Sequence, residues 1–518
     1  MTENGRADPV EANRCPSAWL SGLILLLLLA AAAVLRFQGI GGQSLWLDEY
    51  WALYLATARG DDALDRPLGV VLDPPPDTGF AGAPHWWHIW TGLDSTTHPP
   101  LYHLVLRGWV DLFGDGDSAT HGLSAVLSIA AVALFFDVLR PYGRWRALLA
   151  AGLMTFAPAQ IYFARETRPY ALLMVTALLT ARFALAIVRL GPDRLRVIGL
   201  AVCAVLFALT HYLAAGALIG VGIFAALALP GGRRRAILGA LLAALIFLIV
   251  FWGPQFWRAR GLFHEWDAVH HYQVEPDGGT ALTASQLARA PARLTVATPE
   301  QTVPPLLWIP YFLLAFLVPL GSLRQNPQAA FWWFWVAGSL SFVAVFDIAR
   351  HAAMVQSVKY IFVASPGLYA LLATPLPIRS WLRWLPMTTV LVMVLLAGVE
   401  RFAQGEPRQP DWRIMAQLIQ RNVGPRDLLA FVGSPQAPSI YYDIIFRHYA
   451  PDATNPILLL ENPPDQKLLS QLSHRPRIWV LAFPRDPLDE MFPGWHIGPR
   501  IGGPIEQSLQ QLTPPLAG

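Results

Sequence analysis

The chain has 518 residues, of which 54% are hydrophobic and only 14% are charged, and it contains 20 tryptophans. This composition excludes an ordinary soluble globular protein and is typical of an integral membrane protein. The formal net charge of +3 says little, because the location of charges in a membrane protein matters more than their sum. The two cysteines, Cys15 and Cys203, lie in an N-terminal tail and inside an apolar run. We therefore expect neither a disulfide nor a cysteine-based metal site.

Apolar stretches of membrane-spanning length recur from residue 18 to residue 402 and predict a transmembrane domain that follows a tail of residues 1–17. The first stretch is too long and uninterrupted for the core of a cleavable signal, so we interpret it as a retained anchor. About eleven transmembrane helices are expected, at residues 18–37, 119–139, 147–164, 169–189, 195–213, 214–230, 236–254, 304–322, 329–347, 358–375 and 385–402.

Arginines in the short connecting loops predict the orientation of the chain. They lie at residues 140–146, 189–196, 233–235 and 379–383, and all four loops fall on the same side of the membrane. Because cytoplasmic loops carry an excess of positive charge, the N-terminus is predicted inside the cell. An odd number of spans then places the C-terminus outside.

Residues 38–118 are predicted to form one large external loop. Its segment from His98 to Gly114 reads as a moderately apolar helix, but its apolar length of about fourteen residues is short of the ~20 needed to cross a bilayer. It also carries Arg107 and Asp111. We predict a helix along the membrane surface, with two prolines in its first turn.

Two adjacent carboxylates, Asp48 and Glu49, stand in this loop among Trp46, Tyr50 and Trp51. Carboxylates at a membrane surface can accept a proton or bind a cation. The alternative is an exposed loop anchored by interfacial aromatic residues. His98 belongs to the same loop and is either a site residue or a residue of the turn before the prolines.

Further polar residues return to the same predicted face. Glu166, Arg168 and Tyr170 lie in the turn that joins the third and fourth spans, and Lys359 with Tyr360 begins the tenth. Arg168 and Lys359 supply positive charge where an anionic lipid headgroup can bind. The alternatives are a local ion pair between Glu166 and Arg168, and a Lys359 side chain that merely extends towards the interface.

A divalent metal ion is a weaker possibility in the external loop of residues 255–303. Its histidines His264, His270 and His271 could join a carboxylate in binding a cation, although their spacing is not an established ligand signature. Metal dependence is therefore left open, and no other cofactor is expected.

The character of the sequence changes after residue 403 to Pro-rich, mixed-charge sequence without a membrane-length span. Helices are expected at residues 411–422 and 439–446, with Asp411 as the N-cap, and short buried strands at 428–432 and 478–483. Residues 403–518 are thus predicted to form a small extracytoplasmic α/β domain. It lacks a glycine-rich phosphate loop and a catalytic triad, which favours a structural or acceptor-guiding role.

Several of these motifs, taken in order, resemble the bacterial glycosyltransferases of the GT-C superfamily. They are Leu45-Trp46-Leu47-Asp48-Glu49, His98-Pro99-Pro100-Leu101-Tyr102 with Phe113-Gly114, Glu166-Thr167-Arg168-Pro169-Tyr170, Lys359-Tyr360 followed by Pro366, and Asp411-Trp412-Arg413. In particular, the chain resembles family 39, the relatives of protein O-mannosyltransferases and of the lipid A aminoarabinose transferase. It departs from that pattern in a long insert from about Asp61 to Trp90 and in Lys359, where the family usually has arginine.

The resemblance implies an all-α polytopic membrane protein of GT-C type in the bacterial cytoplasmic (inner) membrane. It also implies a polyprenyl-phosphate-sugar donor and inverting transfer to an envelope lipid, polysaccharide or protein on the outer side, with Asp48 near the acceptor hydroxyl as general base. No nucleic-acid partner is expected. Two other functions remain open, a transporter or flippase for a lipid-linked glycan and a non-catalytic envelope assembly protein. The absence of an internal repeat and the clustering of charges at one face count against a transporter.

Overall fold

The structure is a computed structural model that describes residues 17–60, 66–93, 98–259, 280–297, 326–350, 354–374, 391–392, 394–395, 411–433, 438–475, 477–482, 488–502 and 508–514. Contacts divide the chain into two compact units. We call residues 1–40, 121–257 and 263–406 the membrane unit, and residues 41–120, 258–262 and 407–518 the α/β unit.

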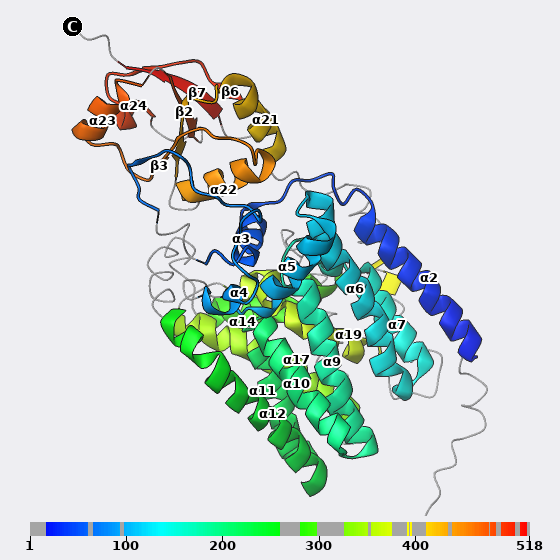
Figure 1. The fold of residues 1–518 in the computed structure, drawn as a ribbon. Helices are drawn as coiled ribbons and strands as arrows, with labels where there is room; N and C mark the ends of the chain where they lie inside the picture. Colours follow the sequence, from blue (N-terminus) through cyan, green and yellow to red (C-terminus); the bar gives the residue numbers. More distant parts are fainter. Residues whose placement is uncertain are drawn as a thin grey trace, which may run out of the picture. The chain divides into compact units, whose positions relative to one another are not determined.

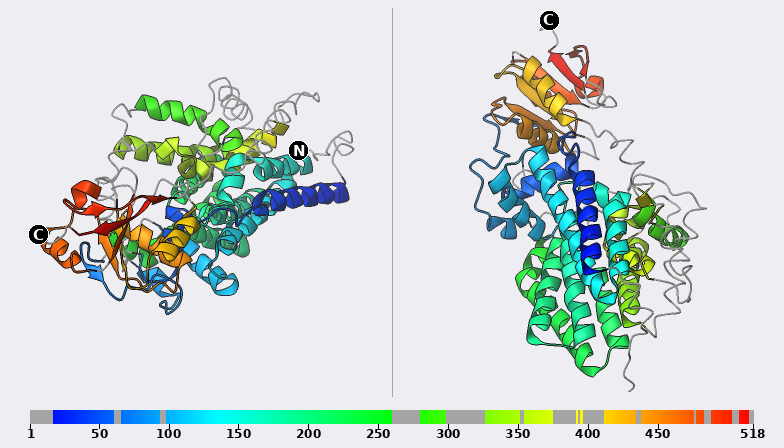
Figure 2. Two further views of the ribbon diagram at one scale, coloured as in Figure 1. Left: turned by 90° about the horizontal axis from the view of Figure 1, so that it is seen from above. Right: turned by 90° about the vertical axis from the view of Figure 1, so that its right-hand side faces the viewer.

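The membrane unit is built from helices (Figure 1). Helices α9 to α12 run side by side, α11 packs on α17, and the exposed helix α2 lies against α7 (Figure 2). The helices of this unit are α2 (Ala18–Phe37), α6 (Asp117–Leu139), α7 (Arg144–Phe156), α8 (Pro158–Phe163), α9 (Tyr170–Leu190), α10 (Arg194–Thr210), α11 (Ala214–Ala228), α12 (Gly231–Phe251), α14 (Thr280–Val296), α17 (Pro327–Arg350), α18 (Val358–Ile361) and α19 (Ser365–Leu372), and the first four residues of α6 belong to the α/β unit.

Five of the described helices, α2, α6, α9, α12 and α17, are long and apolar enough to cross a membrane. The prediction of a polytopic, mainly helical membrane protein is confirmed. The expected run at 147–164 is broken into α7 and α8 at Pro158, because proline lacks the N–H that would continue the helix. The runs predicted at 304–322 and, for the most part, 385–402 lie outside the described residues, so the number of crossings stays a prediction.

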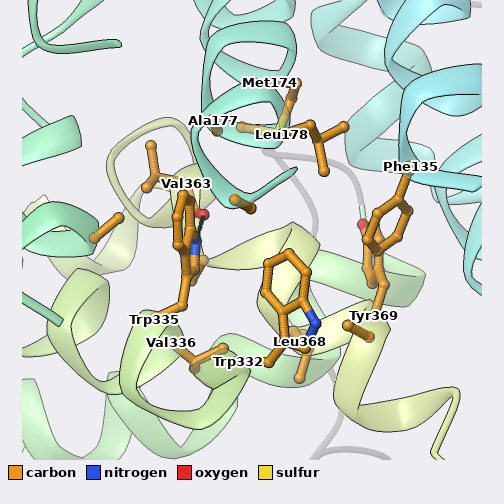
Figure 3. Packing of buried hydrophobic residues seen from close by; sticks show 14 of the residues in the cluster. Phe135, Met174, Ala177, Leu178, Trp332, Trp335, Val336, Val363, Leu368 and Tyr369 are labelled. Atoms are coloured by element: carbon orange, nitrogen blue, oxygen red, sulfur yellow. Dashed lines mark hydrogen bonds between the residues drawn. The ribbon is translucent and has the colours of Figure 1, made fainter. Parts of the chain in front are cut away.

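The core of the membrane unit is rich in large aromatic side chains (Figure 3). Trp332 and Trp335 of α17 are fully buried, and the Trp335 Nε1–H donates to the Val363 carbonyl at 2.9 Å. Phe207 of α10 stacks on Trp335 with ring centroids 5.7 Å apart. The hydrogen bond matters because a buried indole N–H without a partner is costly.

Two buried arginines close helix ends inside this unit. Arg36, at the end of α2, donates to the carbonyls of Met154 (3.1 Å) and Thr155 (3.2 Å) in the last turn of α7. The last carbonyls of a helix have no partner within it, and Pro158 just beyond cannot supply an N–H. Arg146 similarly donates to the carbonyl of Ala370 at 3.0 Å in α19. These two cations are therefore structural.

Helices α11 and α17 approach closely because glycines face one another. Gly216 and Gly220 of α11 lie one helical turn apart, and their backbones lie against Gly338 and Phe334 of α17. Small residues four apart are the usual device that lets membrane helices approach backbone to backbone. An added methyl group at Gly220 would collide with the Phe334 carbonyl.

We expect Gly220→Ala to destabilise the membrane unit by about 1–3 kcal/mol, because overpacking forces two backbones apart. Thermal unfolding of the detergent-solubilised protein measures the effect. Gly222→Ala is the matched control, since a methyl group there meets only the Leu241 side chain at an ordinary 3.7 Å. Equal melting temperatures for the two variants would contradict the close-packing account.

The α/β unit contains a seven-stranded sheet in the order β1-β3-β2-β4-β7-β5, with β6 paired to β7. Strands β2, β3 and β4 are parallel and the remaining pairings are antiparallel. The elements are α3 (Leu47–Ala56), β1 (Val71–Leu72), α4 (His88–Thr91), α5 (Leu101–Phe113), α21 (Trp412–Asn422), β2 (Leu428–Val432), α22 (Ser439–Tyr449), β3 (Ile457–Leu460), α23 (Gln466–Leu472), β4 (Ile478–Ala482), α24 (Leu488–Met491), β5 (His496–Ile497), β6 (Ile501–Gly502) and β7 (Ser508–Thr513).

The C-terminal α/β fold is confirmed. Strands β2 and β4 coincide with the two predicted strands, and α21 begins after Asp411, whose side chain accepts a hydrogen bond from the Arg413 N–H as expected for an N-cap. Helix α5 forms where a surface helix is predicted, directly after Pro100. Its position along the membrane surface remains a prediction.

The described part of the insert is fixed within the α/β unit. Strand β1 adds to the edge of the sheet beside β3. Arg66 pairs with Asp443 at 2.7 Å, and Arg447 pairs with the other oxygen of the same carboxylate at 2.8 Å, in a buried group. Breaking such a buried pair from one side is strongly destabilising. The first loop and the C-terminal residues therefore form one folded body.

Candidate active site

The two adjacent carboxylates lie in the first turn of α3 but differ in their surroundings. Glu49 is 2% exposed, and its Oε2 accepts a hydrogen bond from the backbone N–H of Trp46 at 2.9 Å. This is the second half of a capping box, which closes the start of the helix. Asp48 is partly exposed at the positive end of the helix dipole, where a negative charge is favoured. The observed contact of Glu49 is structural, and its catalytic role stays a prediction.

The segment before and through α3 is held by residues of the C-terminal part of the same unit. Arg413 donates to the carbonyls of Gly41 (2.9 Å) and Gly42 (2.7 Å). The Tyr449 hydroxyl accepts from the Leu45 N–H at 3.3 Å and from the Tyr50 hydroxyl at 2.8 Å. These contacts join positions about 400 residues apart in sequence.

His98 is partly buried in the turn directly before Pro99 and Pro100. It belongs to the same unit as Asp48. Another histidine, His103 of α5, contacts α3: its Nδ1 lies 3.1 Å from the carbonyl of Ala52. Substrate binding by His98 stays a prediction, and His103 was not singled out because a histidine within a helix carries no distinctive sequence signal.

In the membrane unit, the turn from Glu166 to Tyr170 joins α8 to α9. The Arg168 N–H donates to the Glu166 carbonyl at 2.8 Å, and the Ser124 hydroxyl donates to the same carbonyl at 2.5 Å. The side chains of Glu166, Arg168 and Tyr170 are all buried. Burying charged groups is expensive, so this turn is more than a surface connection.

Tyr170 is the centre of a group of charged and aromatic side chains. The Arg168 guanidinium carbon lies 6.0 Å from the Tyr170 ring centroid, and the Phe163 ring packs on the same ring at 4.5 Å. Glu166, Lys359 and Tyr360 also act electrostatically on the Tyr170 hydroxyl. The structure thus brings together the five residues predicted from separate stretches of the chain, namely Glu166, Arg168, Tyr170, Lys359 and Tyr360.

His211 joins this group and was missed in the sequence. It follows the last residue of α10, and its ring stacks on Tyr170 with centroids 6.1 Å apart. Both Arg168 and Lys359 act electrostatically on it. Its Nδ1 accepts a hydrogen bond from the Leu213 N–H at 3.2 Å, so the neutral ring carries its proton on Nε2. We refer to Arg168, Tyr170, His211 and Lys359 as the cation cluster.

The cation cluster has the chemistry of an anion site. A guanidinium offers a fork of N–H donors, an ammonium a compact point charge, and a neutral imidazole one further N–H. The buried rings of Phe163 and Phe362 pack against the Tyr170 ring and give the cluster apolar surroundings. Charge-assisted hydrogen bonds strengthen in such surroundings.

A metal site finds no support in the described part of the chain, where no group of three or more His, Cys, Asp or Glu side chains lies close enough to hold an ion. The histidines His264, His270 and His271 lie outside the described residues. The possible divalent cation therefore stays an open prediction.

Comparison with known proteins gives matches at two levels. Residues 97–257, less than half of the chain, match the family model of dolichyl-phosphate-mannose-protein mannosyltransferases. No curated protein matches the chain in sequence. In fold, the chain is similar to the crystal structure of ArnT from Cupriavidus metallidurans bound to undecaprenyl phosphate, with a TM-score of 0.58, 13% identity, and coverage of 95% of this chain and 98% of that chain.

The apo structure of the same ArnT gives a TM-score of 0.57 at the same identity and coverage. The Archaeoglobus fulgidus oligosaccharyltransferase scores 0.48 at 11% identity, with coverage of 90% of this chain and 69% of that chain. In fold, the chain is thus similar to a membrane glycosyltransferase of the GT-C type. In sequence it is similar to the mannosyltransferase family over residues 97–257, and in fold to ArnT over nearly its whole length. The resemblance inferred from the motifs is confirmed at the level of the superfamily.

Proposed function

We propose that the protein transfers a sugar from a polyprenyl-phosphate-linked donor to a hydroxyl group of an envelope acceptor. The observation that carries this proposal is the cation cluster, which gathers Arg168 and Lys359 around Tyr170 in a unit of GT-C fold. Fixed cations bind a phosphate monoanion or dianion by charge-assisted hydrogen bonds. The similar ArnT structure holds undecaprenyl phosphate, which supports a donor of the same chemical class here.

In the reaction, the acceptor oxygen forms a bond to the anomeric carbon while the bond from that carbon to the lipid phosphate breaks. The configuration at the anomeric carbon is inverted, because attack and departure occur on opposite faces. Asp48 takes the acceptor proton as general base. Arg168 and Lys359 stabilise the negative charge that develops on the departing lipid phosphate. The products are the glycosylated acceptor, now an O-glycoside, and the polyprenyl phosphate.

The remaining predicted residues are assigned to binding. Tyr170 and Tyr360 line the phosphate end of the donor, while Glu166 and His98 orient the sugar or the acceptor. Glu49 supports Asp48 by closing the first turn of α3. The acceptor is an envelope lipid, polysaccharide or protein on the outer side of the bacterial cytoplasmic membrane, with the N-terminus inside and the C-terminus outside.

Reconstitution tests this function directly. The purified protein in liposomes is supplied with undecaprenyl phosphate carrying a radiolabelled sugar, mannose or aminoarabinose, and with envelope extract from a strain that lacks the protein. We expect label to move to an envelope component while undecaprenyl phosphate is released. Movement of the intact labelled lipid to the other leaflet without cleavage would instead identify a transporter. If the donor is neither cleaved nor moved, an assembly role becomes the better account.

A further inference from the structure

Assuming the proposed role of Asp48, we infer that the C-terminal part of the α/β unit positions this carboxylate by holding helix α3 at both ends of its first turn. The contacts come from the side chains of Arg413 and Tyr449 and from the backbone N–H of Trp412. We call these three residues the α3 clamp. Tyr449 and Arg413 are in this sense positioning residues. They act on the reaction through Asp48, and this gives the C-terminal residues a role in transfer.

Arg413 holds the backbone of the segment that leads into α3. Its guanidinium donates to two successive carbonyls, of Gly41 and Gly42, while its Nε binds the Asp411 carboxylate at 2.9 Å. A planar guanidinium with three of its N–H groups engaged in different directions has little freedom. The next residue, Trp412, donates its backbone N–H to the buried Ser44 hydroxyl at 3.1 Å. The path of the chain into α3 is thereby defined.

Tyr449 fixes the first turn itself. One phenol hydroxyl has a single proton to donate and lone pairs to accept, and here every capacity is used. It accepts from the Leu45 N–H and from the Tyr50 hydroxyl, and it donates to the Asp117 carboxylate at 2.9 Å. Leu45 stands three residues before Asp48 and Tyr50 two residues after it. The catalytic carboxylate is bracketed by the two contacts.

The direction of this hydrogen-bond chain does not change with pH in the usual assay range. Burial raises the pKa of the Tyr449 hydroxyl far above its ordinary value, and the neighbouring Asp117 carboxylate raises it further. Burial, followed by the proximity of Tyr449, raises the pKa of Tyr50 as well. Both hydroxyls therefore keep their protons, and Tyr50 donates to Tyr449, which donates to Asp117.

Aromatic packing supports the same arrangement. The His448 ring meets the Tyr50 ring edge-on at 5.5 Å, and Tyr441 meets Trp51 edge-on at 5.6 Å. Helix α22 thus contacts α3 along two successive positions. Loss of the Tyr449 hydroxyl is expected to loosen the hydrogen-bonded turn while these ring contacts keep the helix in place.

The test is Tyr449→Phe in the full-length reconstituted protein. We expect kcat for sugar transfer to fall about tenfold, with the KM for the lipid-linked donor unchanged, because the variant misplaces the base and leaves the phosphate site intact. In an Asp48→Asn background the same substitution should have no further effect on kcat, since residues that act through one another are not additive. Tyr50→Phe, which removes one of the two donors to Tyr449, should reproduce part of the loss.

Leu472→Ala is the matched control for stability, because Leu472 lies in the apolar core of the sheet and is fully buried. It should lower the melting temperature without lowering the kcat of the folded protein. The inference is overturned if Leu472→Ala lowers kcat as much as Tyr449→Phe does, or if Tyr449→Phe lowers the residual rate of Asp48→Asn by the same factor as that of the wild type. Full activity of Asp48→Asn would instead refute the proposed role of Asp48 as general base, and absence of donor cleavage by the wild type would refute the proposed function, so these failures are distinguishable.

Discussion

Replacing Asp48 by asparagine is expected to lower the rate of sugar transfer by roughly 10²–10⁴-fold, the usual contribution of a general base. The amide is nearly the same size as the carboxylate and remains at the start of α3, but it cannot accept a proton. The KM for the donor should change little, because the proposed phosphate-binding residues are untouched. Initial rates with a radiolabelled undecaprenyl-phosphate sugar measure the effect.

Two variants control this result. Asp111→Asn removes an exposed carboxylate of the same unit, which pairs with Arg107 one helical turn away at 3.0 Å, and it should leave the rate unchanged. Glu49→Gln keeps an acceptor oxygen for the Trp46 N–H, so it should retain the capping box and most of the activity. A larger loss for Glu49→Gln than for Asp48→Asn would transfer the role of base to Glu49.

The apolar pattern of the sequence predicted helices well because burial in lipid is a local property of the chain. The first membrane helix and α9 begin and end within a residue of the predicted runs. The interruption at Pro158 was missed, although the proline is visible in the sequence, because the flanking residues are apolar on both sides. The break leaves carbonyls at the end of α7 that accept hydrogen bonds from the buried Arg36. Arg36 lies more than a hundred residues away in sequence, so this contact could not be predicted.

The candidate site was predictable only in part, because some of its residues are distinguished only by contacts within the folded protein. Charged residues at predicted span ends, such as Arg168 and Lys359, are costly enough to attract attention. His211 lay inside an expected span and looked like any core histidine, and only its ring contact with Tyr170 reveals it. Glu49 could not be separated from Asp48, because the hydrogen bond that distinguishes the two depends on the exact start of a helix.

In the α/β unit too, contacts between segments far apart in sequence could not be predicted. Strands β2 and β4 are apolar runs that the sequence identifies, and they lie beside each other in the sheet. Strand β1 comes from the first loop, over 380 residues before the Leu458 position with which it pairs. Pairing across that distance leaves no periodic signal within either segment. The α3 clamp is likewise a set of distant contacts, so neither Tyr449 nor its partners could be selected from the sequence.

A second large effect is expected at Arg168. Removing its charge by Arg168→Gln should lower kcat about 10²–10³-fold, which is typical for the loss of one fixed group that stabilises a developing negative charge. The affinity for undecaprenyl phosphate itself should fall as well, because the product carries the full charge. Native mass spectrometry of the purified protein titrated with undecaprenyl phosphate measures this binding independently of catalysis.

Arg182→Gln is the matched control for Arg168→Gln. Arg182 lies on α9, which begins two residues after Arg168, but its side chain is 47% exposed and pairs with the partly exposed Asp137. An exposed pair contributes little to stability, and Arg182 stands three turns from the cation cluster. Its removal should change neither the rate nor the binding of undecaprenyl phosphate. Equal losses for both variants would mean that these two positive charges act only through general attraction of the anionic lipid.

Conservative substitutions then separate charge from geometry within the cation cluster. Arg168→Lys keeps the positive charge but loses the forked pair of N–H donors of the guanidinium. Compared with Arg168→Gln, it should therefore recover phosphate binding more than kcat. The leaving phosphate needs donors in fixed directions at the moment the bond breaks. Lys359→Arg keeps the charge at a half-buried position and should retain most of both. If Arg168→Lys were fully active, the site would bind the lipid phosphate as a simple pair of point charges. The aromatic packing around Tyr170 would then serve to exclude water rather than to aim the guanidinium.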